Sequence, residues 1–312
     1  MRWFRNAANG KVQRLQKAVE LGVDVNIRDQ NGGTALHHAA FNGRVKTVKV
    51  LVELGADVNA HTPNGATALH TSAQEGHMEA IKVLVELGAD VNTSTLEGFA
   101  ALHAAAQLGE EEAVKVLVEL GADVNTKTNE GVTALHVAAE AGQVKAVKVL
   151  GELGADVNTQ TQIGNTALHQ AAFEGHVEAL KVLVELGANV NTKTNEGGTA
   201  LHVAAQEGRV EALKVLVELG ADVNARMPDE STALHVAAHK GQVEALKVLV
   251  ELGADVDAQL PDGYTTLYAA AQEGQVEALK VLVELGADVK TKQNDGSTPL
   301  HVAARIGHME CV

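Results

Sequence analysis

Short apolar blocks alternate with polar, glycine-marked segments along the whole chain, and both recur at a regular interval. In the block after Thr34, Leu36 and Ala39 fall on one face at helical spacing. The hydroxyl of Thr34 can cap the start of such a helix, and Gly43 can end it. The pattern therefore predicts a short helix between these two residues.

The next apolar block favours a second helix, from about Val45 to Leu54. Its sequence VKVLVEL alternates almost as a strand does, so periodicity alone does not decide between the two structures. The flanking glycines and the further apolar positions favour a helix. A polar tip then runs from Gly55 to Gly65, and its counterparts contain turn-forming sequences such as TNEG and LPDG.

The motif TALH shows that this unit repeats through the chain. Successive starts of the motif and its variants are 33 residues apart without insertions, and GADVN recurs 21 residues after them. The starts are Thr34, Thr67, Ala100, Thr133, Thr166, Thr199, Thr232, Thr265 and Thr298.

The period, TALH with its following alanines, the mid-unit glycine and GADVN together resemble the ankyrin repeat over nearly the whole chain. The resemblance implies an all-α, ankyrin-repeat solenoid of stacked helix-turn-helix units, with projecting β-hairpin tips and a curved, right-angled stack. It also implies a concave binding face made of tips and first helices. The family's usual proline in TPLH occurs only at Pro299, but alanine suits a helix start, so the expected fold is unchanged.

We expect a single domain over residues 1–312, because the repeats leave no room for a linker. It comprises an N-terminal partial or capping repeat (1–28), eight full repeats (29–292) and a truncated C-terminal repeat (293–312). The chain ends part-way into an expected second helix, which indicates a shortened gene or a fragment of a longer protein.

Composition narrows the possible partners. The formal net charge of −15 repels phosphate backbones, so we expect no nucleic-acid partner. No apolar segment is long enough to span a membrane, and the N-terminus does not have the pattern of a signal peptide. The single cysteine, Cys311, allows no internal disulfide. We therefore expect an intracellular, cytoplasmic monomer, with the nucleus as an open alternative.

A possible basic stripe along the tips is expected to be neutralised locally. In four of its five members an acidic residue follows three positions later, so each tip can pair its own charges. The bases are Arg28, Lys127, Lys193, Arg226 and Lys292, and the acids are Glu130, Glu196, Asp229 and Asp295.

A histidine recurs once per unit, but a metal site is not expected. Neighbouring repeats lie roughly 10 Å apart, so successive histidines cannot share one ion. The resemblance implies a structural role, in which the histidine bonds near its own threonine and ties the tip to the helix. No nucleophile motif, phosphate-binding loop or paired cysteine is present, so we expect neither an enzyme nor a cofactor. The recurring histidines are His37, His70, His103, His136, His169, His202, His235 and His301.

Two positions break the repeat pattern and predict weak points. Gly151 replaces the valine of other second helices, and Glu230 replaces a tip glycine. The turn at Glu230 must change its geometry or accept backbone strain.

Specificity in a repeat array should lie where the copies differ, which here is just before TALH and after the double alanine. Exposed aromatics make good binding hot spots, although a phenylalanine at these positions could instead pack against a neighbouring helix. Nearby acids would favour a partner with a basic, apolar-anchored segment. The candidate partner-binding residues are Phe41, Phe99, Phe173, Tyr264, Glu140, Glu174, Glu207 and His239.

The leading hypothesis is a protein-binding scaffold with a preorganised concave groove. The main alternative is a structural spacer, or an engineered or duplicated array without a dedicated partner, because the repeats are nearly identical. A fragment of a larger ankyrin-containing protein is the third hypothesis.

Overall fold

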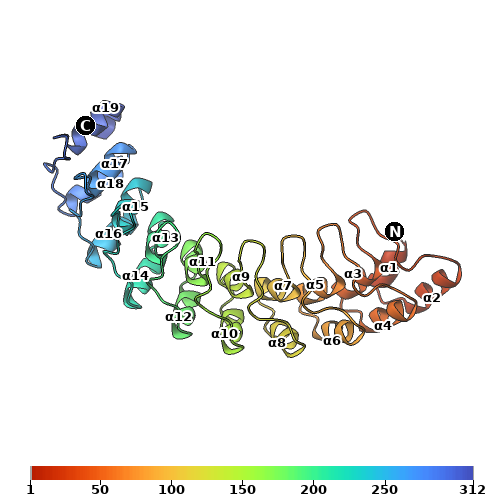
Figure 1. The fold of residues 1–312 in the computed structure, drawn as a ribbon. Coiled ribbons are helices and arrows are strands. Elements are labelled where there is room, and N and C mark those ends of the chain that lie inside the picture. The colour runs from red at the N-terminus through yellow and green to blue at the C-terminus, as the bar shows by residue number, and fades with distance from the viewer. Residues whose placement is uncertain (1, 312) are drawn as a thin grey trace. The chain divides into compact units, whose positions relative to one another are not determined.

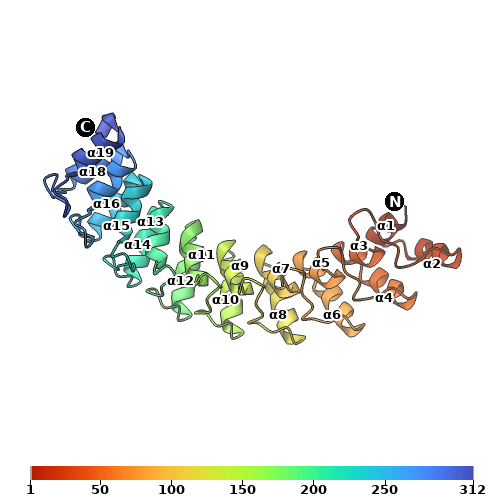
Figure 2. The ribbon, with the colours of Figure 1, turned by 45° about the horizontal axis from the view of Figure 1, so that its top comes forward.

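Two rows of short helices run through each of the two units into which the chain divides, Met1–Thr159 and Gln160–Val312. The computed structural model describes residues 2–311. Within each unit the odd-numbered helices form one row and the even-numbered helices a second row beside it (Figure 1; Figure 2). Each helix packs against its partner in the same repeat and against its counterparts in the adjacent repeats of its unit.

The helices match the predicted two per repeat. The first helices are α1 (Arg2–Ala8), α3 (Ala35–Phe41), α5 (Ala68–Gln74), α7 (Ala101–Leu108), α9 (Ala134–Glu140), α11 (Ala167–Glu174), α13 (Ala200–Gln206), α15 (Ala233–Lys240), α17 (Thr266–Gln272) and α19 (Pro299–Ile306). The second helices are α2 (Val12–Glu20), α4 (Val45–Glu53), α6 (Met78–Glu86), α8 (Glu111–Glu119), α10 (Val144–Glu152), α12 (Val177–Glu185), α14 (Val210–Glu218), α16 (Val243–Glu251) and α18 (Val276–Glu284), followed by the 3-10 turn η1 (Met309–Cys311).

The tips between repeats contain no regular sheet within residues 2–311. Three isolated antiparallel bridges occur instead, His61 with Thr67, Ser94 with Ala100, and Gln259 with Thr265. The remaining tips are held by turn hydrogen bonds, such as Thr62 N–H to the carbonyl of Ala66 at 2.8 Å.

The helix pairs enclose a thin core of small and branched residues. Leu36, Ala39, Ala40 and Leu51 are all buried, and the same positions are buried in most other repeats. Alanine at two successive inner positions lets neighbouring first helices approach closely, which accounts for a core formed with an aromatic content of only 2%. Gly151 lies inside α10, which continues unbroken to Glu152.

In several repeats the recurring histidine joins its repeat to the next, although Nε2 of His202 and Nε2 of His235 make no such hydrogen bond. In His37, Nδ1 accepts the backbone N–H of Thr34 at 3.2 Å, so the ring proton must sit on Nε2. Nε2 then donates to the carbonyl of Ala66, one repeat further on, at 3.1 Å. His70 makes the same pair of bonds, to Thr67 and to Phe99. The structural role that the resemblance implied is confirmed, and it extends between repeats.

Tyr268 occupies the histidine position in one repeat and makes the same kind of connection. Its buried hydroxyl donates to the carbonyl of Ser297 and accepts the N–H of Gln293 at 3.1 Å. A larger side chain therefore reaches the same part of the following tip.

A second connection comes from the asparagine that ends GADVN. The amide of Asn59 donates to the carbonyl of Gly88 at 3.1 Å and accepts the N–H of Asp90 at 3.1 Å. Asp257 stands at this position late in the chain. Its carboxylate accepts the N–H of Asp288 at 2.8 Å, but it has no N–H to donate to the neighbouring carbonyl.

We predict that Asp257→Asn stabilises the protein by about 1 kcal/mol, because it restores one hydrogen bond between repeats. The measurement is urea-induced unfolding followed by circular dichroism. Glu251→Gln removes the same charge from an exposed residue without adding that bond, so it controls for reduced charge repulsion. Equal gains from both variants would show that charge alone accounts for the effect.

A second prediction concerns acid stability. Burial lowers the pKa of His37, His70, His103, His202 and His235, the last to about 4. These rings are neutral in the folded protein. Their contribution to the free energy of unfolding is therefore fully present above the unfolded-state pKa of 6.5. It is lost as pH falls from 6.5 through the folded values. For His235 alone this amounts to about 3 kcal/mol.

The urea concentration at the unfolding midpoint should therefore decrease as pH falls from 6.5 to about 5, above the range where carboxylates with ordinary pKa values are protonated. His235→Gln should flatten this slope, because the variant lacks one of the buried rings. An unchanged slope in His235→Gln would contradict the assignment.

Candidate partner-binding groove

A groove lies on the second unit, between the helices α11, α13 and α15 and the adjoining tips. It encloses about 420 Å³. Its apolar lining consists of Ile163, Phe173, Val203, Met227 and Val236. Ile163 is 64% exposed and Phe173 is 41% exposed, so this lining is open to solvent. Apolar side chains gathered in an open hollow are typical of an interaction site.

The polar part of the groove carries no cation. Gln170, Gln206, Asn195 and Glu196 line it, and no Lys or Arg is among the lining residues. Gln206 also donates to the carboxylate of Glu207 at 2.9 Å, which places a second acid beside the groove. His202 lines the groove as well, and burial lowers its pKa, so its ring is neutral near pH 7. The groove is therefore apolar at its centre and acidic at its edge.

One wall of the groove is held by a strained tip. Glu230 has a φ of +68°, the left-handed value that favours glycine. Its N–H donates to the carbonyl of Met227 at 2.9 Å, and its carboxylate lies 3.3 Å from the guanidinium of Arg226. Met227 N–H in turn donates to the carbonyl of Ser231. The strain expected at this position is present, in the turn that carries a groove residue.

The predicted partner-binding residues fall in both units. Phe41, Phe99 and Glu140 belong to the first unit, and the other five belong to the second. Phe41 is 49% exposed at the end of α3, and Glu140 is exposed at the end of α9. Phe99 is only half-buried, with its ring 5.2 Å from that of His103, so the packing alternative describes it better.

In the second unit, only Phe173 lines the groove directly. Glu174 and Glu207 are half-buried at the C-terminal ends of α11 and α13. His239 is exposed, with Nδ1 3.5 Å from the carboxylate of Glu273. Tyr264 is half-buried against Tyr268, with ring centroids 5.7 Å apart, and burial raises its pKa to about 12.

The groove also contains residues that the sequence comparison did not select. Val203 and Val236 occupy one register, three residues before Gln206 and His239, where other repeats carry His38 or Thr71. This register also varies, with five residue types in the nine copies from His38 to Val302, and that variation could have identified it. Ile163 and Met227 are apolar residues on otherwise polar tips, which is a second usable signal.

The ion pairs predicted at three-residue spacing within the tips are wrong, although Arg226 pairs with Glu230 of its own tip at 3.3 Å. Among the described residues, none of the four pairs at three-residue spacing forms. Three of the five cations instead donate to backbone carbonyls of the following tip, among them Lys193 to Arg226 at 2.8 Å and Arg226 to Gln259 at 3.1 Å. Arg28 likewise donates to the carbonyl of His61. The tips lie close enough for a long side chain to reach the next tip, so the cations cap carbonyl groups and join neighbouring repeats.

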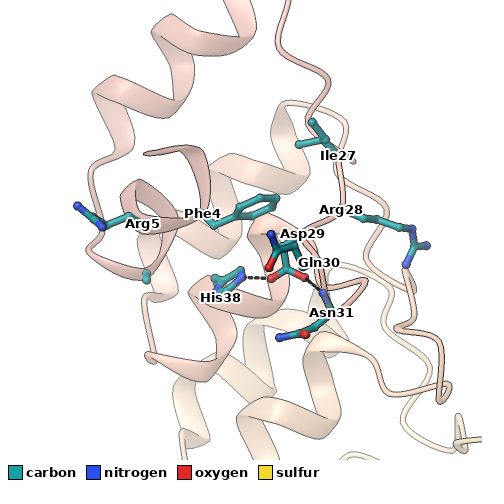
Figure 3. Close-up of a pocket in the computed structure, with 9 residues that line it drawn as sticks. Phe4, Arg5, Ile27, Arg28, Asp29, Gln30, Asn31 and His38 are labelled. Atoms are coloured by element: carbon teal, nitrogen blue, oxygen red, sulfur yellow. Dashed lines mark hydrogen bonds and ion pairs between the residues drawn. The ribbon is translucent and has the colours of Figure 1, made fainter. Parts of the chain in front are cut away.

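A larger cavity, of about 690 Å³, lies at the N-terminal end of the first unit (Figure 3). Nε2 of His38 lies 2.7 Å from the carboxylate of Asp29, and the ring of Phe4 lies 5.2 Å from that of His38. Burial opposes ionisation of Asp29, but the bonds from His38 and the N–H of Gly33 hold its pKa below the ordinary value. Arg5 and Arg28 point away from this cluster in Figure 3. No Ser, Thr or Cys lines the cavity, so the pair ties α3 to its tip without a nucleophile to activate.

Across residues 2–311, no group of three or more His, Cys, Asp or Glu side chains is arranged to hold a metal ion. None of the described helices has the length and apolar character needed to cross a membrane.

The chain belongs to the ankyrin-repeat family. The family model described as "Ankyrin repeats (3 copies)" matches residues 4–95, 93–161, 153–227 and 225–293, and the single "Ankyrin repeat" model matches residues 295–312. Among solved structures, the ankyrin repeat domain of human ASB11 is similar, with a TM-score of 0.63 and 31% sequence identity. That match covers 71% of this chain and 99% of the ASB11 domain. Comparison with curated proteins gives no match.

The strained tip generates a prediction. We expect Glu230→Gly to stabilise the protein by about 0.5–1 kcal/mol. Relief of left-handed strain, about 1–2 kcal/mol, outweighs the added freedom of glycine in the unfolded chain and the loss of one exposed ion pair. Urea unfolding measures the change.

Gly296→Ala is the matched reverse substitution. Gly296 has a φ of +81°, and a Cβ there would meet no atom within 4 Å, so the variant reports strain without a clash. It should lose a similar amount of stability. If Glu230→Gly is less stable than the parent, the contacts of Glu230 outweigh its strain.

Proposed function

We propose that this protein is a protein-interaction scaffold that binds a peptide or a folded partner in the groove of its second unit. Family membership supports protein binding in general, because ankyrin repeats are protein-protein interaction modules. The observation that carries the specific site is the open apolar lining around Phe173, which the repeat scaffold does not need for its own packing.

The partner proposed for this groove has an apolar anchor flanked by basic residues. Ile163, Phe173 and Val236 offer contact area for the anchor. Glu196 and Glu207 lie at or beside the edge, and no cation lines the groove to neutralise them. Electrostatic complementarity would then set orientation and association rate more than affinity.

The remaining features of the proposal follow from the array. The chain acts as one non-enzymatic, monomeric, cytoplasmic array of a partial repeat (1–28), eight full repeats (29–292) and a C-terminal partial repeat (293–312). The competing proposal, a spacer or duplicated array without a dedicated partner, is favoured by the near-identity of the repeats. The two proposals differ in whether the groove selects a ligand.

The test is selection of a phage-displayed random peptide library on the immobilised protein. We expect enrichment of peptides that contain a large apolar residue beside Lys or Arg. A synthetic peptide with an enriched sequence should bind the Phe173→Ala variant about thirtyfold more weakly than it binds the parent protein. This is the effect of losing a hot spot that contributes about 2 kcal/mol.

Phe41→Ala is the matched control, because Phe41 occupies the same register in the first unit, is similarly exposed and does not line this groove. It should leave the affinity unchanged within twofold. Enrichment of no peptide, or of peptides indifferent to Phe173→Ala, would favour the spacer. Circular dichroism establishes that both variants remain folded.

A further inference from the structure

The first 50 residues are basic, although the protein as a whole is acidic. They contain nine of the 25 Lys and Arg residues but only three of the 40 Asp and Glu residues. A terminal repeat needs a polar outer face for solubility, but acidic residues would serve that purpose equally well. The nine cationic residues are all exposed: Arg2, Arg5, Lys11, Arg14, Lys17, Arg28, Arg44, Lys46 and Lys49.

Two of these cations differ from their counterparts in other repeats. Arg14 stands where later repeats have a small buried residue, as at Thr47. Lys46 stands where nearly all later second helices carry glutamate. The exception is Lys145, which pairs with Glu111 of the preceding repeat at 2.9 Å.

The position that corresponds to Glu111 in the repeat before Lys46 is Val12, which carries no charge. Lys46 therefore lacks the neighbour that neutralises Lys145. This difference is local to the first two repeats.

Lys11, Arg14 and Lys46 together line a cavity of about 290 Å³ between the starts of α2 and α4. Gly10, Val12 and Gln13 complete the lining, so it includes no acid. Within residues 2–311, none of the three cations is in an ion pair. Like charges held together repel one another, and an anion that enters the cavity relieves this repulsion.

We propose that this basic cluster, Lys11, Arg14 and Lys46, docks an acidic segment of a partner polypeptide. Charge complementarity and the size of the cavity both favour a short run of carboxylates. A long nucleic acid fits less well, because the cations span only two repeats and the rest of the chain is strongly acidic.

A second copy of the chain is also a poorer occupant. Most glutamates near the start of its second helices are already paired with a lysine three residues later, as Glu112 is with Lys115 at 2.6 Å and Glu211 is with Lys214 at 2.7 Å. The proposed site lies in the first unit and is independent of the groove around Phe173.

The experiment measures fluorescence anisotropy of fluorescein-labelled hexaglutamate with the full chain, at low and at physiological salt. We expect saturable binding that weakens as salt rises. The triple variant Lys11→Glu, Arg14→Glu and Lys46→Glu should weaken it at least about tenfold. The milder Arg14→Gln with Lys46→Gln should weaken it in the same direction, and circular dichroism confirms folding.

The matched control reverses three lysines elsewhere: Lys82→Glu, Lys115→Glu and Lys148→Glu. This control changes the net charge by the same amount but leaves the basic cluster intact, so it should retain nearly full binding of hexaglutamate. Equal weakening by both triple variants would overturn the proposal, because net charge would then explain it. Absence of saturable binding at low salt, or tighter binding of a labelled hexathymidylate that also depends on the cluster, would overturn it as well. Phe173→Ala should leave hexaglutamate binding unchanged, so this result stands apart from that of the groove.

Discussion

The bond from a buried imidazole to the carbonyl of the next repeat is the interaction on which the rest of the array depends. In His70 the backbone N–H of Thr67 occupies Nδ1, which forces the proton onto Nε2 and aims it at Phe99. One side chain therefore fixes the start of its helix, its own tautomer and the position of the following tip. The same geometry opposes protonation, since a second ring proton would face the N–H of Thr67.

This constraint separates positions that must repeat from positions that are free to change. The histidine, its threonine and the asparagine of GADVN connect neighbouring repeats, so they recur almost unchanged. Side chains that face the open surface between helix and tip carry no such bond. Phe173 and Val236 lie at positions that vary between repeats, and they gather in one groove of the second unit.

Much of the helical fold could be predicted from the sequence because it is local. The helix expected from Val45 to Leu54 ends one residue earlier, at Glu53. The tip contacts could not be predicted in this way. Whether Lys193 pairs with Glu196 or reaches Arg226 depends on the spacing between tips, which the order of residues does not state. The exposure of Phe99 and Tyr264 likewise depends on the rings they pack against. Only Phe41 and Phe173 of the four selected aromatics are therefore exposed.

The near-identity of these connections also bears on how the chain finds its native order. A repeat that skipped its neighbour and stacked on the next one would make almost the same histidine and asparagine bonds, so most interfaces discriminate weakly against such mispairing. The native pairing of repeats is therefore distinguished from mispairing mainly by the few contacts that occur only once. The hydroxyl of Tyr268 on Gln293 is one, and the carboxylate of Asp257 on the N–H of Asp288 is another. These irregular residues therefore favour the native order of the repeats during folding, because the other contacts between repeats are nearly identical throughout the array.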